Sequence, residues 1–340
     1  TVFLVVFGTY LIHSSNPDYK ITMGALIASV ILSGRALAPL SQIASLAIKF
    51  QSAKLALQGI NNIVARPIER DPSRQYISLA LVEGQITFEN IQFQYQRDAA
   101  PAVKDITLNI NSGEKVAILG HIGSGKSTLL KLASGLYEAN AGHVTLDNID
   151  IRQIDPSDLR SKVSLLSQSP RLFLGTLRDN LELARTDHFS TDQQLMHVLH
   201  QFGLDKVINQ HPQGLDMQLG ENGLGLSGGQ KQLIALARLT LRDPQVVLLD
   251  EPTTGLDQET ELSALDALQN WAKQRTLLVV THRPQVLALV DRIIVMENGA
   301  ITMDGPKAEI LAKLVQQQPQ NIPSVKPKVH RVSVSARIRK

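Results

Sequence analysis

Apolar side chains near the start of the chain form two runs that a short polar turn separates. The first run, TVFLVVFGTYLI, fills residues 1–12, and the second holds 28 residues from Ile21 with a single charge, Arg35. About 20 apolar residues are enough to cross a bilayer as a helix. The second run therefore predicts a membrane-spanning helix, and the first predicts the downstream end of a truncated one. A buried helix of a soluble protein or a signal-peptide core is the alternative for the first run.

The helical spacing of apolar residues continues past the second run as far as Val64, and Pro67 disfavours helix at the residue before it. A helix from Ile21 to Ala65 would be roughly 68 Å long, against a hydrocarbon core of about 30 Å. About half of it must therefore project beyond the membrane. Arg35 would lie about 21 Å along this helix, where it either faces an aqueous pathway or reaches the inner headgroups.

From Gly84 the pattern changes to short apolar runs that alternate with helical ones, which predicts an α/β domain. The strand-like runs are ITFENIQFQY, KVAILG, HVTLD, KVSLLS, QVVLLD, TLLVVT and RIIVME. The helical patterns are STLLKLASGL, the segment after Ser227, and ELSALDALQNWAKQ. We therefore divide the chain into a membrane portion (residues 1–66), a linker (67–83), an α/β domain (84–315) and a disordered tail (316–340).

Composition narrows this picture in two ways. The chain has no cysteine, which excludes disulfides and thiolate metal sites. Its net charge of +3 comes from the tail, where six basic residues and no acid occur, so that 28 Lys and Arg face 31 Asp and Glu elsewhere. A nearly neutral body does not predict a nucleic-acid-binding face. The tail itself is either solvated or attracted to anionic lipid.

The first chemical motif is GHIGSGKS, which follows the apolar strand VAIL and opens a helix. Glycines in such a loop let backbone N–H groups and the helix N-terminus converge on phosphates. Lys126 would neutralise the β- and γ-phosphates, and Ser127 would bind Mg²⁺. We expect an ATP-binding loop made of Gly120, His121, Ile122, Gly123, Ser124, Gly125, Lys126, Ser127 and Thr128.

Two further motifs lie downstream. In VVLLDEP, Asp250 ends a buried strand, where it can hold the Mg²⁺ shell, and Glu251 follows it, where it can polarise a water molecule. LGLSGGQKQL is a second glycine-rich turn that opens a second long helix. Its backbone N–H groups and helix dipole, at Ser227, Gly228, Gly229 and Gln230, can point at a phosphate.

The order of these motifs, with Gln168 between the first two and GLD and His282 at the end, resembles the nucleotide-binding domain of an ABC ATPase over about residues 84–315. The resemblance implies that Tyr95 stacks on adenine and that Gln168 touches Mg²⁺ and reports to the membrane domain. It further implies that Asp257 lies at a dimer seam and that His282 contacts the γ-phosphate. Taken alone, Tyr95 could be strand surface, Gln168 could be loop, and His282 could be a histidine at a strand end.

If each turn serves a different ATP, the working unit is a head-to-tail dimer of two copies. The membrane portion is similar to exporters of the half-transporter kind, in the inner membrane with several spanning helices and the ATPase in the cytoplasm. SGRALAPL, DIRQIDPSDLR and GTLRDNL resemble type I secretion exporters. That resemblance implies a periplasmic adaptor, an outer-membrane channel and a secreted RTX-like adhesin or toxin as partners.

Other functions remain as alternatives. An exporter of lipid, drug or peptide is the nearest of them. A mechanical ABC ATPase would carry a coiled coil between the two glycine-rich turns, and no heptads occur there. Translation-type ABC proteins carry two cassettes, and a regulatory subunit without catalysis would not be expected to keep both Glu251 and His282.

The sequence departs from the family pattern at His121, at Asn222 in GENG and at Thr254–Gly255. Gly255 could loosen the loop before Asp257. Asn148 stands where glycine is frequent, and we expect it to adopt the left-handed turn conformation that asparagine tolerates.

Overall fold

The structure is a computed structural model that describes residues 2–13, 21–66, 68–96, 98–184 and 190–317. It contains two compact units, residues 1–71 and 72–340, each of which is described by itself. The division falls inside the predicted linker. The later part of this linker belongs to the second unit: Ile77 N donates to Gln153 O, and Leu79 and Val82 lie against the core of that unit.

The first unit consists of α1 (Val2–Ile12) and α2 (Met23–Val64). Helix α2 begins where Thr22 caps the N–H of Ala25 and ends at Ala65, close to the predicted limits. Its 42 residues make it about 63 Å long. It is the described helix that is long and apolar enough to cross a membrane, whereas α1 has only 11 residues.

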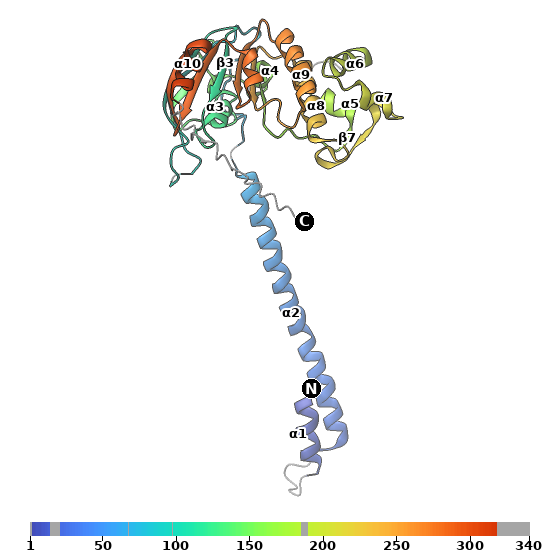
Figure 1. Ribbon diagram of the computed structural model, residues 1–340. Helices are drawn as coiled ribbons and strands as arrows, with labels where there is room; N and C mark the ends of the chain where they lie inside the picture. Colours follow the sequence, from blue (N-terminus) through green and yellow to red (C-terminus); the bar gives the residue numbers. More distant parts are fainter. Residues whose placement is uncertain (1, 14–20, 67, 97, 185–189, 318–340) are drawn as a thin grey trace, which may run out of the picture. The chain divides into compact units, whose positions relative to one another are not determined.

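The second unit is built on two sheets (Figure 1). The larger has the order β12-β11-β3-β10-β9-β6, in which β12 pairs antiparallel and the other neighbours pair parallel. These strands are β3 (Lys115–Leu119), β6 (Val163–Leu166), β9 (Val246–Asp250), β10 (Thr276–Val280), β11 (Arg292–Glu297) and β12 (Ala300–Pro306). The fold is therefore mixed α/β, as the alternating pattern predicts.

The smaller sheet is antiparallel, with the order β2-β1-β4-β5. It contains β1 (Ile86–Phe93), β2 (Val103–Ile110), β4 (Ala141–Leu146) and β5 (Ile149–Asp150). A two-stranded ribbon pairs β7 (Gly175–Thr176) with β8 (Gln218–Leu219). The seven predicted strands are all present, but β2, β5, β7, β8 and β12 were not predicted.

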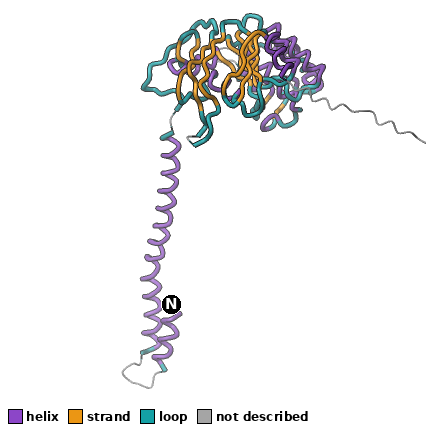
Figure 2. The backbone as a smooth tube through the Cα atoms, turned by 60° about the vertical axis from the view of Figure 1, so that its left-hand side comes forward, coloured by secondary structure: helices purple, strands orange, loops and turns teal. Residues whose placement is uncertain are grey.

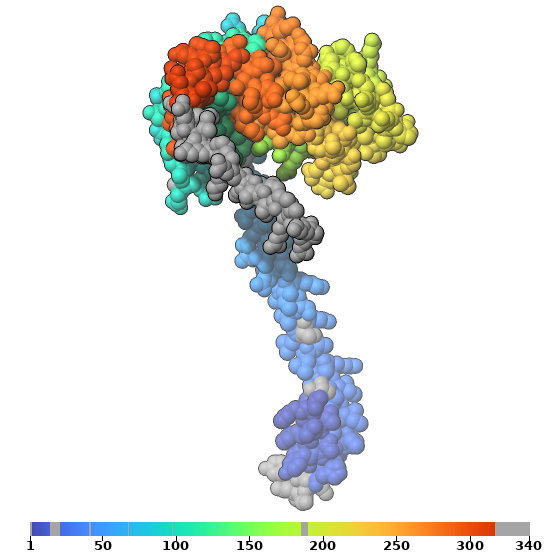
Figure 3. Space-filling model, viewed as in Figure 1, coloured from blue at the N-terminus to red at the C-terminus, as the bar shows by residue number. Residues whose placement is uncertain are grey.

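The helices of this unit are α3 (Lys126–Ala133), α4 (Pro156–Lys162), α5 (Leu177–Glu182), α6 (Asp192–Gln201), α7 (Asp205–Gln210), α8 (Gly228–Arg242), α9 (Gln258–Trp271) and α10 (Lys307–Gln317). Helices α5 and α6 contact α8. The ribbon shows α5, α6 and α7 together beside α8, and the same part of the chain is yellow in the space-filling view (Figure 3). Figure 2 shows the strands gathered in one part of the unit, with helices beside them. The predicted tail begins inside α10, and its remainder lies outside the described residues.

The larger sheet is buried on both faces, which explains its continuous apolar strands. In β9, Val246 and Leu248 join the core shared with the smaller sheet and α3, whereas Val247 and Leu249 join the core under α8 and α9. Strand β10 divides its side chains in the same way. This packing fixes the carboxyl ends of the strands, where the predicted motifs lie.

Candidate active site

Four of the predicted motifs follow neighbouring parallel strands at one edge of the larger sheet. The glycine-rich loop follows β3, His282 follows β10, Asp250 ends β9 and Gln168 lies just beyond β6. The register aligns Val280 with both Ile118 and Asp250. Because parallel strands end at a common edge, segments far apart in the sequence meet there, where open α/β sheets bind ligands.

The first glycine-rich loop needs its glycines for conformation and for space. Gly120, Gly123 and Gly125 have φ values of 149°, 83° and 98°, in the region that favours glycine. A Cβ atom on Gly120 would lie 2.1 Å from the carbonyl oxygen of Met296, and one on Gly125 would lie 2.3 Å from that of Ala102. The backbone of this loop is therefore closely packed where it turns into α3.

Lys126 lies folded over its own loop. Its Nζ atom donates to the carbonyl oxygens of Gly120 and His121, both at 2.8 Å. Burial lowers the pKa of Lys126, while the nearby Glu251 and Asp250 act in the opposite direction. The ammonium group is thus partly desolvated, and its hydrogen bonds go to neutral carbonyl oxygens. An anionic phosphate would bind this ammonium group more strongly than the carbonyls do.

The acidic pair lies at the end of β9. Asp250 and Glu251 are 7% and 8% exposed. Burial raises the pKa of Asp250, an effect that a hydrogen bond from Ser127 partly offsets. Glu251 has a left-handed φ of 51°, which is costly for a residue with a side chain, and its N–H donates to Val280 O at 2.9 Å.

The two carboxylate oxygens of Glu251 have different surroundings. Oε1 lies 2.6 Å from Nδ1 of His282, whose side chain is otherwise 74% exposed. Oε2 is buried and has no hydrogen-bond partner among the residues that the structure describes. A buried acceptor without a donor is uncommon in folded proteins. One oxygen therefore positions the histidine, and the other is available to a ligand.

Tyr95 stands beside the start of α3. Its hydroxyl lies 2.9 Å from Oγ1 of Thr128, and its ring packs edge-on against Phe93 and Tyr137 at 5.0 and 5.3 Å between centroids. The ring is half exposed. Tyr137, which the sequence did not single out, therefore belongs to this aromatic group. The side chain of Ile122 at the loop tip is fully exposed, and Gln168 is also exposed.

The second glycine-rich turn is not hydrogen-bonded to the first in the described part of the chain. Ser227 caps α8 by accepting from Gln230 N at 3.2 Å, and the Gln230 side chain accepts from Ser227 N at 2.8 Å. Gly228 is exposed. Gly229 packs on the segment after Glu251, since a Cβ atom there would lie 3.0 Å from Gly255 O. The capping hydrogen bonds between Ser227 and Gln230 therefore order this turn, and the first glycine-rich loop does not.

Asp257 caps α9. Its carboxylate accepts from Thr260 N and Oγ1 at 3.0 and 2.8 Å, and the backbone N–H bond in particular lowers its pKa. Gly255 has a left-handed φ of 80°, which suits glycine at this departure from the family pattern. The prediction for Asn148 is confirmed, because its φ is 65°.

A buried polar network supports these motifs, and the sequence did not reveal it. Gln232 of α8 is 2% exposed and donates to Pro252 O at 2.8 Å. Glu261 of α9 accepts from Thr253 Oγ1 at 2.6 Å and pairs with Arg283 at 3.0 Å. The only sequence signal was a polar residue on an otherwise buried helix face. The network joins α8, the segment after Glu251 and the residue after His282.

Comparisons with known proteins show what the chain is similar to. Residues 103–254 match the family model described as ABC transporter. The exotoxin translocation ATP-binding protein PaxB of Pasteurella aerogenes is 35% identical over 304 residues, which cover 89% of this chain and 42% of that protein. The ATP-dependent lipid A-core flippase of Salmonella typhimurium is 36% identical over 305 residues, covering 89% and 52%. The chain thus spans about half the length of the curated relatives it matches.

The solved structure of a bacterial Atm1-family ABC exporter with ATP bound superposes with a TM-score of 0.74 at 25% identity. It covers 94% of this chain, which covers 56% of the exporter chain.

Proposed function

Because the chain contains an ABC transporter domain, we propose that it is the ATP-hydrolysing part of an exporter, whose membrane portion includes α2. The observation that carries this proposal is the unpartnered Oε2 of Glu251, beside a carboxylate oxygen that His282 holds in place. A carboxylate fixed in this way can accept a hydrogen bond from an attacking water molecule. Nothing else in the described site offers a better placed base.

Other residues at the carboxyl ends of the parallel strands would bind the nucleotide. Lys126 would exchange its backbone carbonyls for phosphate oxygens, and His282 would add a contact to the terminal phosphate. Tyr95 would lie against the adenine ring. The backbone N–H groups from Gly120 to Thr128 would surround the phosphates at the start of α3.

The oxygen donors at the site fit a magnesium ion. Ser127, Gln168 and Asp250 offer a hydroxyl, an amide and a carboxylate, the ligand types that Mg²⁺ prefers alongside phosphates and water. When bound, Mg²⁺ supplies positive charge that neutralises the phosphates. The raised pKa of Asp250 is consistent with such a site, because a carboxylate buried at a cost gains most from a nearby cation.

A second copy of the chain completes the site in this proposal. Ser227, Gly228, Gly229 and Gln230 would face the nucleotide held by the partner, and Asp257 would lie at the seam between the copies. ATP binding would then join two ATPase domains, and hydrolysis would release them. The likeness to a solved ABC exporter with ATP bound supports this proposal.

The exported substrate is proposed to be a protein, as the names of PaxB and of the Toxin RTX-I translocation protein of Actinobacillus pleuropneumoniae suggest. That function would place the protein in the inner membrane with several spanning helices, and add a periplasmic adaptor and an outer-membrane channel. The flippase relative, at 36% identity, favours lipid export as the second candidate. In the full-length protein, stimulation of ATP hydrolysis by lipid A rather than by an unfolded RTX polypeptide would favour the second candidate.

Glu251→Gln tests the catalytic proposal. The change keeps the size of the side chain but removes the basic oxygen, so ATP binding should persist while turnover falls about a hundredfold or more. Nucleotide affinity and phosphate release are measured on the same preparation. Glu309→Gln, on the outer helix α10, is the matched control and should change neither. A Glu251→Gln chain that hydrolyses ATP at the parental rate would show that the base is misassigned.

A further inference from the structure

Glu261 is a buried carboxylate to which the proposed reaction gives no role. It lies on α9, one turn after Asp257, and is 4% exposed. Removing a carboxylate from water is costly unless opposite charge and hydrogen bonds replace the water. Here Oε1 accepts from Thr253 Oγ1 at 2.6 Å, and Oε2 lies 3.0 Å from Nη1 of Arg283. Each oxygen of Glu261 is therefore bound by a different segment of the chain.

These two segments are the ones that carry the proposed base and its histidine. Thr253 is two residues after Glu251, and Arg283 directly follows His282. Oε1 of Glu251 and Nδ1 of His282 meet at 2.6 Å. A single carboxylate, that of Glu261, thus links the two segments whose side chains meet at the candidate active site.

The ring of His282 has few contacts of its own that could hold it. Its side chain is 74% exposed, and Glu251 is the hydrogen-bond partner of its ring among the described residues. Exposed side chains change rotamer readily, so the position of the ring depends on how firmly the backbone beside it is held. Before it, Thr281 is 2% exposed and its Oγ1 accepts from Arg283 N at 3.0 Å. After it, the side chain of Arg283 pairs with Glu261.

The turn after β9 also depends on this carboxylate. The left-handed φ of Glu251 is costly and persists only where the surrounding contacts over-determine it. Those contacts include the bond from Glu251 N to Val280 O at 2.9 Å and the bond from Thr254 N to Glu251 O at 3.2 Å. Thr253, which is 1% exposed, adds its hydrogen bond to Glu261. Glu261 therefore helps to hold both members of the contact between the base and the histidine.

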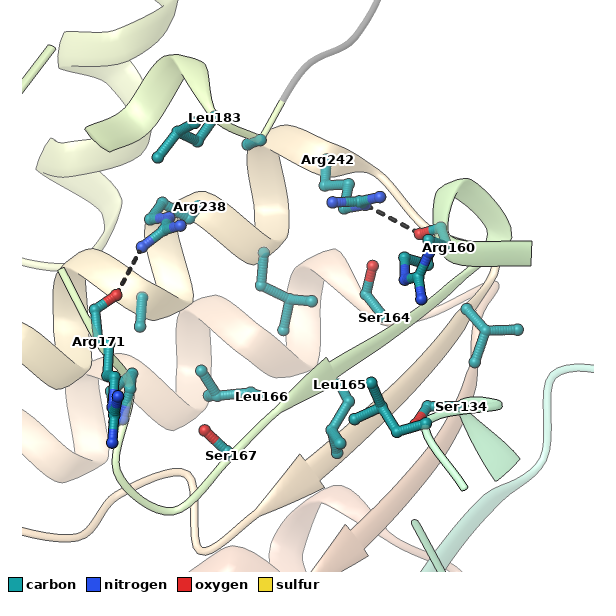
Figure 4. A pocket seen from close by; sticks show the side chains of 16 residues that line it. Ser134, Arg160, Ser164, Leu165, Leu166, Ser167, Arg171, Leu183, Arg238 and Arg242 are labelled. Atoms are coloured by element: carbon teal, nitrogen blue, oxygen red, sulfur yellow. Dashed lines mark hydrogen bonds between the residues drawn. The ribbon is translucent and has the colours of Figure 1, made fainter. Parts of the chain in front are cut away.

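Another partly buried arginine of this unit is held in a different way. On α8, Arg242 donates to the carbonyl oxygen of Arg160 at 2.9 Å (Figure 4). A neutral carbonyl oxygen is thus sufficient to fix a guanidinium group, and it belongs to one segment only. A buried carboxylate is not needed merely to anchor Arg283. What Glu261 adds is a second oxygen, which binds Thr253 at the same time.

We propose that Glu261 is a positioning residue for ATP hydrolysis, which holds His282 in place through Arg283. This inference rests on the proposed function, in which Glu251 polarises the attacking water. The ion pair fixes the backbone beside His282, and the ring of His282 in turn holds Oε1 of Glu251. Oε2 of Glu251 then stays available to water. Loss of the ion pair should therefore slow the chemical step and change ATP affinity little.

Glu261→Gln tests this role on the full chain in lipid nanodiscs. The amide keeps the size of the side chain and an oxygen for Thr253, but it removes the charge that pairs with Arg283. At saturating ATP we expect kcat to fall about tenfold, the value of one charge-assisted hydrogen bond, while the Kd for ATP changes by less than about twofold. Asp266→Asn, an acid-to-amide change at an exposed position of the same helix, is the matched control and should change neither.

A double-mutant cycle shows whether Glu261 acts through His282. His282→Ala alone should lower kcat about a hundredfold or more, because it removes the group that holds the base and contacts the terminal phosphate. If Glu261 acts by placing this ring, adding Glu261→Gln to His282→Ala should lower kcat further by less than about twofold. A purely structural role of Glu261 predicts instead that the two losses multiply, to about a thousandfold. Single-turnover hydrolysis measures rates this low.

Two further comparisons separate positioning from folding. Arg283→Lys keeps the positive charge and should retain more turnover than Arg283→Gln, which should lose as much as Glu261→Gln. Ala264→Gly weakens α9 without touching the ion pair, so it should lower the thermal midpoint while kcat well below that midpoint stays parental. If Glu261→Gln does not fold, the Arg283 variants carry the same cycle with His282→Ala, since the side chain of Arg283 is 29% exposed.

Parental turnover of Glu261→Gln would overturn the proposal, and so would losses that multiply in the cycle or an equal loss of kcat with Ala264→Gly. A His282→Ala chain that hydrolyses ATP at the parental rate would overturn it as well. The proposed function fails separately, if Glu251→Gln keeps parental turnover. Loss of turnover in Glu251→Gln together with parental turnover in Glu261→Gln would refute the positioning role alone.

Discussion

The two glycine-rich turns of this protein use glycine for different reasons. In the first, the glycines have positive φ, and a side chain at Gly120 or Gly125 would collide with neighbouring backbone. In the second, Gly225 also has a positive φ of 103°, but Gly228 and Gly229, where α8 begins, are absent from the positive-φ residues of the described chain, and a Cβ atom on Gly228 would meet nothing within 4 Å. The first turn is shaped by its own chain, whereas nothing within the chain explains Gly228.

Charge separates the two turns as well. The first holds Lys126 and faces Asp250, and burial shifts both pKa values toward the neutral forms. The second is satisfied by its own capping hydrogen bonds, and the nearby Asp257 has a lowered pKa because Thr260 donates to it. The charged groups of the first turn are thus buried at a cost. The second turn has its own capping hydrogen bonds and exposes its backbone at Gly228.

The largest expected effect comes from separating the two turns onto different chains. Lys126→Ala removes the phosphate-binding cation, and Gly229→Asp places a carboxylate where the partner's phosphate would lie, so each variant alone should lose ATP-driven association. In a mixture of the two full-length chains, one site of a mixed dimer carries both lesions and the other is intact. About a quarter of the parental sites should then return if the chains pair at random. ATP-dependent crosslinking is the measurement, because turnover could require both sites.

The control for this mixture is proof by differently tagged chains that mixed dimers form. If mixed dimers are present and crosslinking stays as low as in either variant alone, both turns serve the ATP of one chain. The comparison above would then have to be abandoned, and Gly228 would need another explanation.

A smaller effect should distinguish the glycines within the first turn. Gly125→Ala combines an unfavourable φ of 98° with a Cβ atom 2.3 Å from Ala102 O, whereas Gly123→Ala has an unfavourable φ of 83° in open space. We expect a loss of unfolding free energy of about 2–5 kcal/mol for the first. The second should lose about 1–2 kcal/mol. Thermal unfolding of the full chain measures both, and equal losses would show that close packing does not set the shape of this loop.

The sequence predicted the motifs whose residues are adjacent in the chain and follow a clearly apolar strand. The apolar runs of β3, β9 and β10 are continuous because both faces are buried, and they place the loop and the acidic pair correctly. Strands β2 and β12 were missed although β1, with a similar alternation of buried and exposed residues, was predicted. Strands β5, β7 and β8 have only two residues each, too few to show a pattern. The short helices from α4 to α7 were missed because their six to ten residues hold few apolar repeats.

What the sequence could not give is the pairing of residues far apart in the chain. Gln232 meets Pro252 across a helix and a strand, and Glu261 meets Arg283 through the fold of α9 against the segment after β10. Ser164 and Arg242 share a cavity although 78 positions separate them. No local pattern encodes such contacts, because their partners are chosen by the packing of the larger sheet.

The smallest expected effect on the fold, and the sharpest test of the second turn, is Gly228→Ala. Residue 228 is the first residue of α8, has ordinary helical surroundings and leaves room for a methyl group. Alanine is favoured over glycine in a helix by roughly 0.5–1 kcal/mol, so the variant should be as stable as the parent or slightly more stable. ATP-driven crosslinking should nevertheless fall, because the methyl group would stand between the backbone and the partner's phosphate. Gly203→Ala, at another exposed glycine remote from the turn but with a φ of 69°, controls for adding a methyl group and should lose stability instead. A Gly228→Ala chain that crosslinks as well as the parent would mean that this glycine is not kept for a second subunit.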